Sequence, residues 1–333
     1  MTRNTGRHPS ARGPAPGNRA QETLAGSIMK KFGRTGRAAT RAATGVTAVA
    51  LAAGAVLAGS AGSAAAITGP PRTTTPAMAG HALTSVSSRA YVFATSGRNS
   101  KNVKTIAKDC PAGQDVIGTG YHIDGANGAV AVSALVPTPA SAPTSVRLRA
   151  VELNPFPGKW SVTVEAVCDD VATTVSAATT AFNSANTKNK STNCGNLRVI
   201  GTGYSIREPT SPVPVIGSIG MDPALTTVTI YASEAFPTAA KWSLTALAIC
   251  SPDLGQTLVT ATEVPPVDSA SPETVPAACP ASTPTTGGGF FTDARGAVVA
   301  DDLTIIPKMA TTVAYEDQPY TPNWTLRTSA ICA

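Results

Sequence analysis

One strand is written three times in this chain, and this repetition constrains the fold more than any other feature. The copies read KWSVTVEAVC (159–168), KWSLTALAIC (241–250) and NWTLRTSAIC (323–332), so each of the three tryptophans lies eight residues before a cysteine. Counting back from each tryptophan gives a proline at five residues and a glutamate at eight. Such fixed offsets indicate internal repetition.

The repeats also open alike, with CPAGQDVIGTGY at 110–121, CGNLRVIGTGY at 194–204 and CPASTPTTGGGF at 279–290. The opening cysteines are 84 and 85 residues apart. An extended segment precedes each opening, which places repeat 1 at 89–170, repeat 2 at 171–254 and repeat 3 at 255–333. The sequence therefore predicts three tandem repeats of about 84 residues.

The repeated strand has the period of an extended chain. Alternate side chains share one face of a strand, so Trp160, Val162, Val164, Ala166 and Cys168 point to the same side. Thr, Val, Ala and Ser dominate elsewhere and no helical period is sustained, which predicts an all-β fold with about five strands per repeat. We expect the three tryptophans to belong to the core; the alternative is exposed rings that stack on sugars.

The residues before the repeats have another composition. A basic segment from Met29, an apolar stretch rich in Ala and Gly, and Ala64-Ala65-Ala66 are typical of a secretory signal peptide at 29–66, within a leader at 1–66. The alternative, a membrane span, is disfavoured because the stretch is short. Cleavage after Ala66 predicts a secreted, extracellular protein without a membrane anchor. Residues 67–88 are predicted to be a disordered lead-in.

Charge and cysteine content narrow the partners. Nine of the 26 Lys and Arg residues and one of the 20 Asp and Glu residues lie in 1–66, which leaves 17 basic and 19 acidic residues in the mature chain. This balance predicts no nucleic-acid partner. All six cysteines lie in the mature chain, and an even number in an exported protein indicates disulfides. The threefold repetition leaves two pairings open, one within repeats and one between neighbouring repeats.

The C-P-x-G…G-x-G opening, the closing A-[VI]-C and the threefold repetition resemble the vitelline membrane outer layer protein family and small bacterial modules of the pattern CPxGxxVxGGG…W…C. The first resemblance implies a pseudo-threefold β-prism; the alternative is three β-sandwich-like units in a row. The single-copy modules carry both cysteines, which implies the pairs Cys110–Cys168, Cys194–Cys250 and Cys279–Cys332. Neither resemblance implies catalytic residues.

Glycines in the repeat openings have two interpretations. Gly118 and Gly120, with Gly201 and Gly203, would permit a bulge or the close approach of another chain segment. A phosphate-binding loop is the functional alternative, but it needs a helix directly after the glycines, and the sequence predicts none.

Reactive groups are few. A Ser–His–Asp site would have to use His81 or His122, and both are expected to be surface residues. Disulfide-bonded cysteines leave no thiolate nucleophile and, with so little histidine, no predicted metal site or cofactor. The acidic pairs Asp169-Asp170 and Asp301-Asp302 lack the spacing of a calcium-binding loop, and we expect solvated turns.

The glutamate triplet Glu152, Glu234 and Glu316 is the sharpest candidate binding site. Three related carboxylates could line a pocket for a sugar or Ca²⁺, or two of them could act as acid and base in glycoside hydrolysis. Alternatively, each accepts backbone N–H bonds in its own E-x-x-P turn. Repetition favours this structural role, because a folding requirement recurs in every copy.

These observations favour a secreted, non-enzymatic binding or structural protein that recognises a glycan, a cell-wall polymer or another cell-surface partner. One alternative is an extracellular carbohydrate-active hydrolase that uses the repeated glutamates. The other is a purely structural surface or coat component. Fold class does not separate these three functions.

Overall fold

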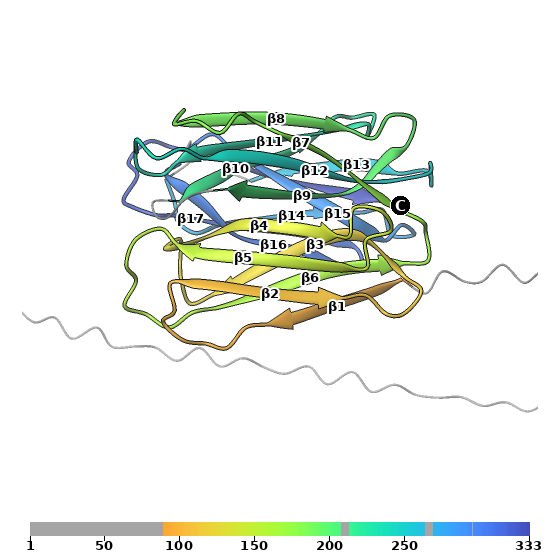
Figure 1. The fold of residues 1–333 in the computed structure, drawn as a ribbon, viewed down its shortest axis with the longest axis horizontal. Helices are drawn as coiled ribbons and strands as arrows, with labels where there is room; N and C mark the ends of the chain where they lie inside the picture. Colours follow the sequence, from red (N-terminus) through yellow and green to blue (C-terminus); the bar gives the residue numbers. More distant parts are fainter. Residues whose placement is uncertain (1–88, 208–212, 264–268, 295) are drawn as a thin grey trace, which may run out of the picture. The chain divides into compact units, whose positions relative to one another are not determined.

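The computed structural model describes residues 89–207, 213–263, 269–294 and 296–333. These residues form 18 β-strands and no α-helix (Figure 1), which confirms the all-β prediction. None of the described segments is a helix long and apolar enough to cross a membrane. The predicted leader, its signal peptide, the lead-in and His81 lie outside the described residues.

Each repeat contributes six strands in the same order, which confirms the threefold repetition. Repeat 1 contains β1 (Ala90–Thr95), β2 (Val103–Asp109), β3 (Asp115–Asp124), β4 (Val130–Thr138), β5 (Ser145–Glu152) and β6 (Ser161–Asp169). Repeat 2 contains β7 (Thr174–Thr179), β8 (Thr187–Asn193), β9 (Arg198–Arg207), β10 (Pro214–Met221), β11 (Thr227–Glu234) and β12 (Ser243–Ser251). Repeat 3 contains β13 (Thr257–Thr262), β14 (Glu273–Ala278), β15 (Thr285–Thr292), β16 (Val298–Ile306), β17 (Met309–Glu316) and β18 (Leu326–Cys332).

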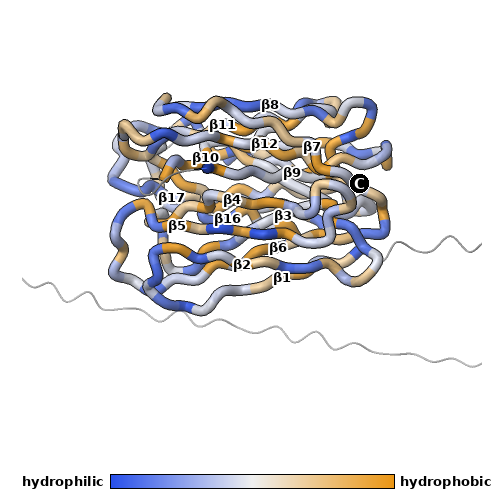
Figure 2. Tube along the Cα trace, viewed as in Figure 1, coloured by the Kyte–Doolittle hydropathy of each residue, from blue (hydrophilic) through white to orange (hydrophobic). Residues whose placement is uncertain are grey.

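The prediction of about five strands per repeat was wrong by one strand. The additional strands are β2, β8 and β14, which end directly before the opening cysteines. They lie at sheet edges, and β8 reads TKNKSTN, so Figure 2 shows it in hydrophilic colours. Polar and charged side chains protect an edge strand from pairing with another chain. A strand made of such side chains shows no alternation of apolar residues by which it could be predicted.

Three six-stranded sheets share the 18 strands, and every sheet combines two repeats. The strand orders are β1-β6-β3-β16-β17-β14, β13-β18-β15-β10-β11-β8 and β2-β5-β4-β9-β12-β7. We call the three central pairings between repeats the β3–β16, β10–β15 and β4–β9 seams. Repeat 1 thus pairs with repeat 3, repeat 3 with repeat 2, and repeat 2 with repeat 1.

This cyclic pairing excludes one of the two predicted arrangements. Three sandwich-like units in a row would each keep their own sheets, whereas each described sheet needs strands from two repeats. A β-prism needs sheets that follow one another around an axis, and the cyclic order is compatible with it. The prism geometry itself stays a prediction.

Three equivalent glycines bring the repeats into close contact. A Cβ on Gly118 would lie 1.6 Å from a carbonyl oxygen of repeat 3, on Gly201 2.4 Å from one of repeat 1, and on Gly287 2.8 Å from one of repeat 2. Each glycine also adjoins a shift in strand register. They lie inside β3, β9 and β15, so no helix follows them and the phosphate-loop alternative is excluded.

Apolar packing and disulfides complete the fold. The largest buried cluster draws on all three repeats and contains Trp160 and Trp242, while Trp324 belongs to a smaller cluster. The disulfides are Cys110–Cys168, Cys194–Cys250 and Cys279–Cys332, with Cα–Cα distances of 5.7, 5.5 and 5.7 Å. Each therefore joins the opening of a repeat to the end of its tryptophan strand, and no pair joins neighbouring repeats.

Candidate functional site

The repeated glutamates bind their own turns and their own tryptophans. In each repeat, one carboxylate oxygen accepts the backbone N–H four residues later, and the other accepts the indole N–H eight residues later. The backbone donors are Phe156, Thr238 and Tyr320, at 3.2, 2.9 and 3.0 Å. The indole donors are Trp160, Trp242 and Trp324, at 3.0, 3.0 and 3.3 Å.

These contacts account for both repeated residue types. The tryptophan side chains are at most 1% exposed, so each buried indole N–H needs an acceptor, and the glutamate supplies it. Glu152, Glu234 and Glu316 end β5, β11 and β17, which belong to three different sheets. The structure therefore does not bring the glutamates together, and each carboxylate is occupied within its own repeat.

In repeats 1 and 2, a lysine also contacts the tryptophan that is bonded to the glutamate. The Nζ atoms of Lys104 and Lys188 lie 4.3 and 4.7 Å from the ring centroids of Trp160 and Trp242. The Lys104 ammonium also donates to three main-chain carbonyl oxygens. Burial lowers the pKa of both lysines, and the neighbouring glutamates partly offset this effect. Repeat 3 has Glu273 at the equivalent register.

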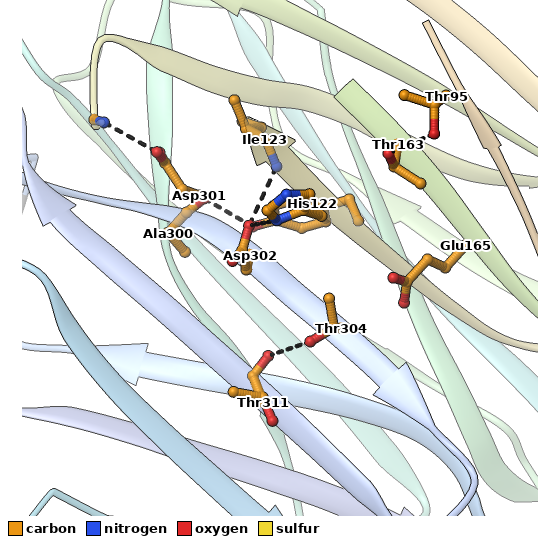
Figure 3. A network of polar contacts seen from close by, with 12 residues as sticks. Thr95, His122, Ile123, Thr163, Glu165, Ala300, Asp301, Asp302, Thr304 and Thr311 are labelled. Carbon is orange, nitrogen blue, oxygen red and sulfur yellow. Dashed lines mark hydrogen bonds and ion pairs between the residues drawn. The ribbon is translucent and has the colours of Figure 1, made fainter. Parts of the chain in front are cut away.

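His122 and Asp302 form a second candidate site at the β3–β16 seam. The two residues are register partners on strands of repeats 1 and 3, and Figure 3 shows the imidazole against the carboxylate. His122 Nδ1 lies 2.6 Å from Asp302 Oδ1, which also accepts the backbone N–H of Ile123 at 3.2 Å. The hydrogen bond to Asp302 raises the pKa of His122, and burial opposes part of this rise.

Glu165 on β6 lies beside this pair (Figure 3) and bridges the same seam. Its Oε2 accepts the backbone N–H of Ile305 at 2.9 Å. Ile305 lies on β16, two residues after Leu303, which is the last residue of β16 that pairs with β3. The carboxylate occupies space that a Cβ on Gly120 would take, since that atom would lie 2.8 Å from Oε2. Burial raises the pKa of Glu165.

Asp301, the neighbour of Asp302, is buried rather than solvated. Its side chain is 1% exposed, and its Oδ2 accepts the backbone N–H of Gly128 at 3.1 Å. Its Oδ1 has no hydrogen-bond partner in the described part of the chain. Burial raises the pKa of Asp301 well above its ordinary value, which favours the neutral carboxyl. The prediction of a solvated turn at 301–302 was wrong, because both residues lie inside β16 at a bulge.

The other acidic pair is also not a fully solvated turn. Asp169 is the last residue of β6 and is fully buried. Its Oδ2 lies 2.9 Å from Arg89 Nε. Only Asp170, whose N–H donates to Asp169 Oδ1 at 2.8 Å, is exposed as predicted.

A histidine with an aspartate supplies two members of a Ser–His–Asp site. The described residues provide no hydroxyl group bonded to His122. Thr163, the register partner of His122 on β6, shares a 2.9 Å hydrogen bond with Thr95 instead (Figure 3). The arrangement can hold or release a proton, but it presents no activated nucleophile.

A cleft of about 310 Å³ at the β10–β15 seam is the third candidate. Its lining comes from β8, β10, β11, β15 and the residue after β15, namely Asn189, Ser218, Tyr231, Phe291, Thr292 and Asp293. Phe291 is 41% exposed, and the Arg327 guanidinium lies 5.6 Å from its ring centroid. The cleft therefore combines aromatic rings with hydroxyl, amide and carboxylate groups.

Tyr231 is the most informative residue of the cleft. A Cβ on Gly217 would lie 3.1 Å from a ring carbon of Tyr231, so the glycine allows the ring to lie close to the sheet. The Tyr231 hydroxyl oxygen is buried and has no hydrogen-bond partner among the described residues. Asp293 is partly occupied, because its Oδ1 accepts the backbone N–H of Thr325 at 2.8 Å.

Sequence reasoning missed this cleft and the partner of His122, because both sites join different repeats. One signal was available: His122, Ser205 and Phe291 hold the same place in the three copies with different chemistry. Among the residues that the structure describes, no group of three His, Cys, Asp or Glu side chains is placed to hold a metal ion. Comparison with protein-family models gives no match, and comparison with curated proteins gives none either.

Proposed function

We propose that this protein is secreted and non-enzymatic, and that it binds a glycan in the cleft at the β10–β15 seam. The observation that carries the proposal is the pairing of two aromatic rings, Tyr231 and Phe291, with neutral polar groups in one cleft. Three disulfides are compatible with an oxidising, extracellular environment.

The chemistry of the lining supports a sugar as ligand. One face of a sugar ring presents C–H groups that pack on an aromatic ring, and its edge presents hydroxyl groups that need donors and acceptors. Phe291 offers an exposed ring, while Asn189 and Ser218 offer an amide and a hydroxyl. Ligand sites in proteins typically have volumes of about 300–1,000 Å³, and this cleft lies at the small end of that range.

The hydrolase alternative has less support from the same residues. Glycoside hydrolysis generally requires two carboxyl groups about 5–10 Å apart. The cleft lining includes one carboxylate, Asp293, and one of its oxygens already accepts a backbone N–H. The repeated glutamates are bound to turns and indoles on three separate sheets.

The test is saccharide binding by the secreted protein, first on a glycan array and then by titration calorimetry. Phe291→Ala should weaken binding about ten-fold, because it removes the stacking surface. Phe93→Ala is the matched control, since Phe93 is a 68% exposed phenylalanine on another sheet. Absence of binding by the wild type would favour the structural or coat role, and release of reducing sugars would favour the hydrolase.

A further inference from the structure

The three seams share one backbone register but carry different side chains. In each seam, a residue on the inner strand of one repeat pairs with a residue on the inner strand of another. The second of these residues also pairs with a residue on the neighbouring strand of its own repeat, and the residue directly before it forms a β-bulge. Ser218, for example, pairs with Phe291 of repeat 3 and Tyr231 of repeat 2. Four equivalent positions therefore face the same region of each sheet, and their side chains can be compared directly.

At the β10–β15 seam, these four positions are occupied by Gly217, Ser218, Tyr231 and Phe291. None of them carries a charge. Glycine at the bulge leaves the surface open, and the tyrosine ring lies close to it. The cleft described above is located here.

At the β3–β16 seam, the same positions are Asp301, Asp302, Val313 and His122. Imidazole and carboxylate bind each other at 2.6 Å across the seam. His122 thus lies at the position equivalent to Phe291, and its ring is hydrogen-bonded to Asp302. No aromatic side chain occupies any position except that of His122 itself.

At the β4–β9 seam, the positions are Ser133, Ala134, Arg149 and Ser205. The Arg149 guanidinium donates to Ser133 Oγ at 2.7 Å, so a charged side chain lies where the other seam has the Tyr231 ring. Ser205 lies at the position equivalent to Phe291. The pseudo-threefold backbone therefore does not give three equivalent surfaces.

We infer that the protein has a single saccharide site, at the β10–β15 seam, and that the four seam positions set its preference for an uncharged sugar residue. This inference rests on the proposed function. Threefold repetition alone would suggest three ligands per chain, whereas the side chains provide the stacking pair once. The Tyr231 hydroxyl is buried and has no hydrogen-bond partner among the described residues, and a sugar hydroxyl bound in the cleft would supply one.

Charge supports the preference for a neutral sugar. The charged group in the lining is the Asp293 carboxylate, which repels an acidic sugar and accepts hydrogen bonds from a neutral one. The Arg327 guanidinium is outside the cleft lining and makes a cation–π contact with the ring of Phe291, 5.6 Å from its centroid.

Titration calorimetry with methyl β-glucoside, methyl β-galactoside, N-acetylglucosamine and glucuronic acid tests the inference on the full secreted chain. We expect one ligand per chain and weaker binding of glucuronic acid than of methyl β-glucoside. Tyr231→Phe should weaken binding of the neutral sugar about five- to ten-fold, the loss expected for one hydrogen bond. Tyr231→Phe preserves the ring, so an unchanged affinity would exclude the hydroxyl contact.

A seam exchange supplies the decisive variant. Ser218→Asp with Phe291→His copies the His122–Asp302 pair into the β10–β15 seam, where the same register accepts it, and should abolish binding while the chain still folds. The reciprocal change, Asp302→Ser with His122→Phe, is the matched control and should leave affinity unchanged. Circular dichroism of both variants checks folding.

The outcomes separate the inference from the function. Three ligands per chain, full affinity after the first exchange in a folded protein, or loss of binding after the second would overturn the single-site inference while glycan binding stands. If the wild type binds neither these probes nor any glycan on the array, the proposed function itself fails.

Discussion

The indole N–H of Trp160 donates a 3.0 Å hydrogen bond to Oε1 of Glu152, and the same bond joins Trp242 to Glu234 in the next repeat. The other oxygen of each glutamate holds the backbone of the intervening turn. One carboxylate therefore fixes both the loop before the tryptophan strand and the ring that begins it. This double use explains why glutamate and tryptophan keep their eight-residue offset in every copy.

Truncation of the tryptophan should be the more costly change at this unit. Trp242 is fully buried, and Trp242→Ala should lower the free energy of unfolding by about 3–5 kcal/mol, since it leaves a large cavity. Glu234→Ala should cost about 1–3 kcal/mol, because two N–H donors lose their acceptor. Urea denaturation of both variants measures the two changes. A Glu234→Ala protein as stable as the wild type would contradict the proposed bonding role.

The glycines between repeats should tolerate no side chain. Gly201→Ala places a methyl group 2.4 Å from the Ile117 carbonyl oxygen, and relief of this clash must move two repeats apart. We expect a loss of about 1–3 kcal/mol or more. Gly220→Ala is the matched strand control, since its nearest atom would lie at an ordinary 3.6 Å. Thermal melting of both proteins compares them, and equal melting temperatures would refute the close approach.

Much of this architecture could be predicted from the sequence, because its determinants lie within single repeats. The Trp–Cys strand, the glycine-rich opening and the glutamate turn are local patterns that recur three times. Strand β8 was missed because an edge strand needs no continuous apolar face, and β8 contains no apolar residue.

The candidate sites were harder to predict, because they form between repeats. His122 and Asp302 are 180 residues apart in the chain, and Tyr231 and Phe291 meet only when β10 pairs with β15. Local periodicity specifies which side chains leave a strand on the same face, but it does not specify which strand of another repeat will be the neighbour. The sequence shows that His122, Ser205 and Phe291 differ, but only the pairing at each seam shows which side chains of another repeat they meet.

The disulfides should contribute strongly to stability because each closes a long loop. Cys194 and Cys250 are 56 residues apart, for which the chain-entropy model gives about 4 kcal/mol. Replacing both cysteines with alanine should lower the free energy of unfolding by about this amount. A single Cys194→Ala change adds a free thiol and is the less clean test. Denaturation of the double variant without reductant measures the effect, and a change below about 1 kcal/mol would argue against this loop-closure account.

The β3–β16 seam should make stability depend on pH. The pKa of His122 is raised above its ordinary value of 6.5 by Asp302, so the folded protein binds this proton more tightly than the unfolded chain does. The contribution is complete below pH 6.5 and is lost as the pH rises through the folded pKa.

Glu165 and Asp301, which contribute to the same seam, also have raised pKa values, so their contributions have the same sign but are lost from more acidic pH upward. His122→Ser, which copies Ser205 from the β4–β9 seam, should remove the histidine step above pH 6.5. It also removes the His122 charge, which lowers the pKa values of Glu165 and Asp301, so the acidic part should change as well. Because the imidazole is half-exposed, we expect a step of less than about 1 kcal/mol. Urea denaturation from pH 5 to pH 9 measures it, and a wild-type stability that rises across pH 6.5 to 8 by an amount absent from His122→Ser would contradict the pairing.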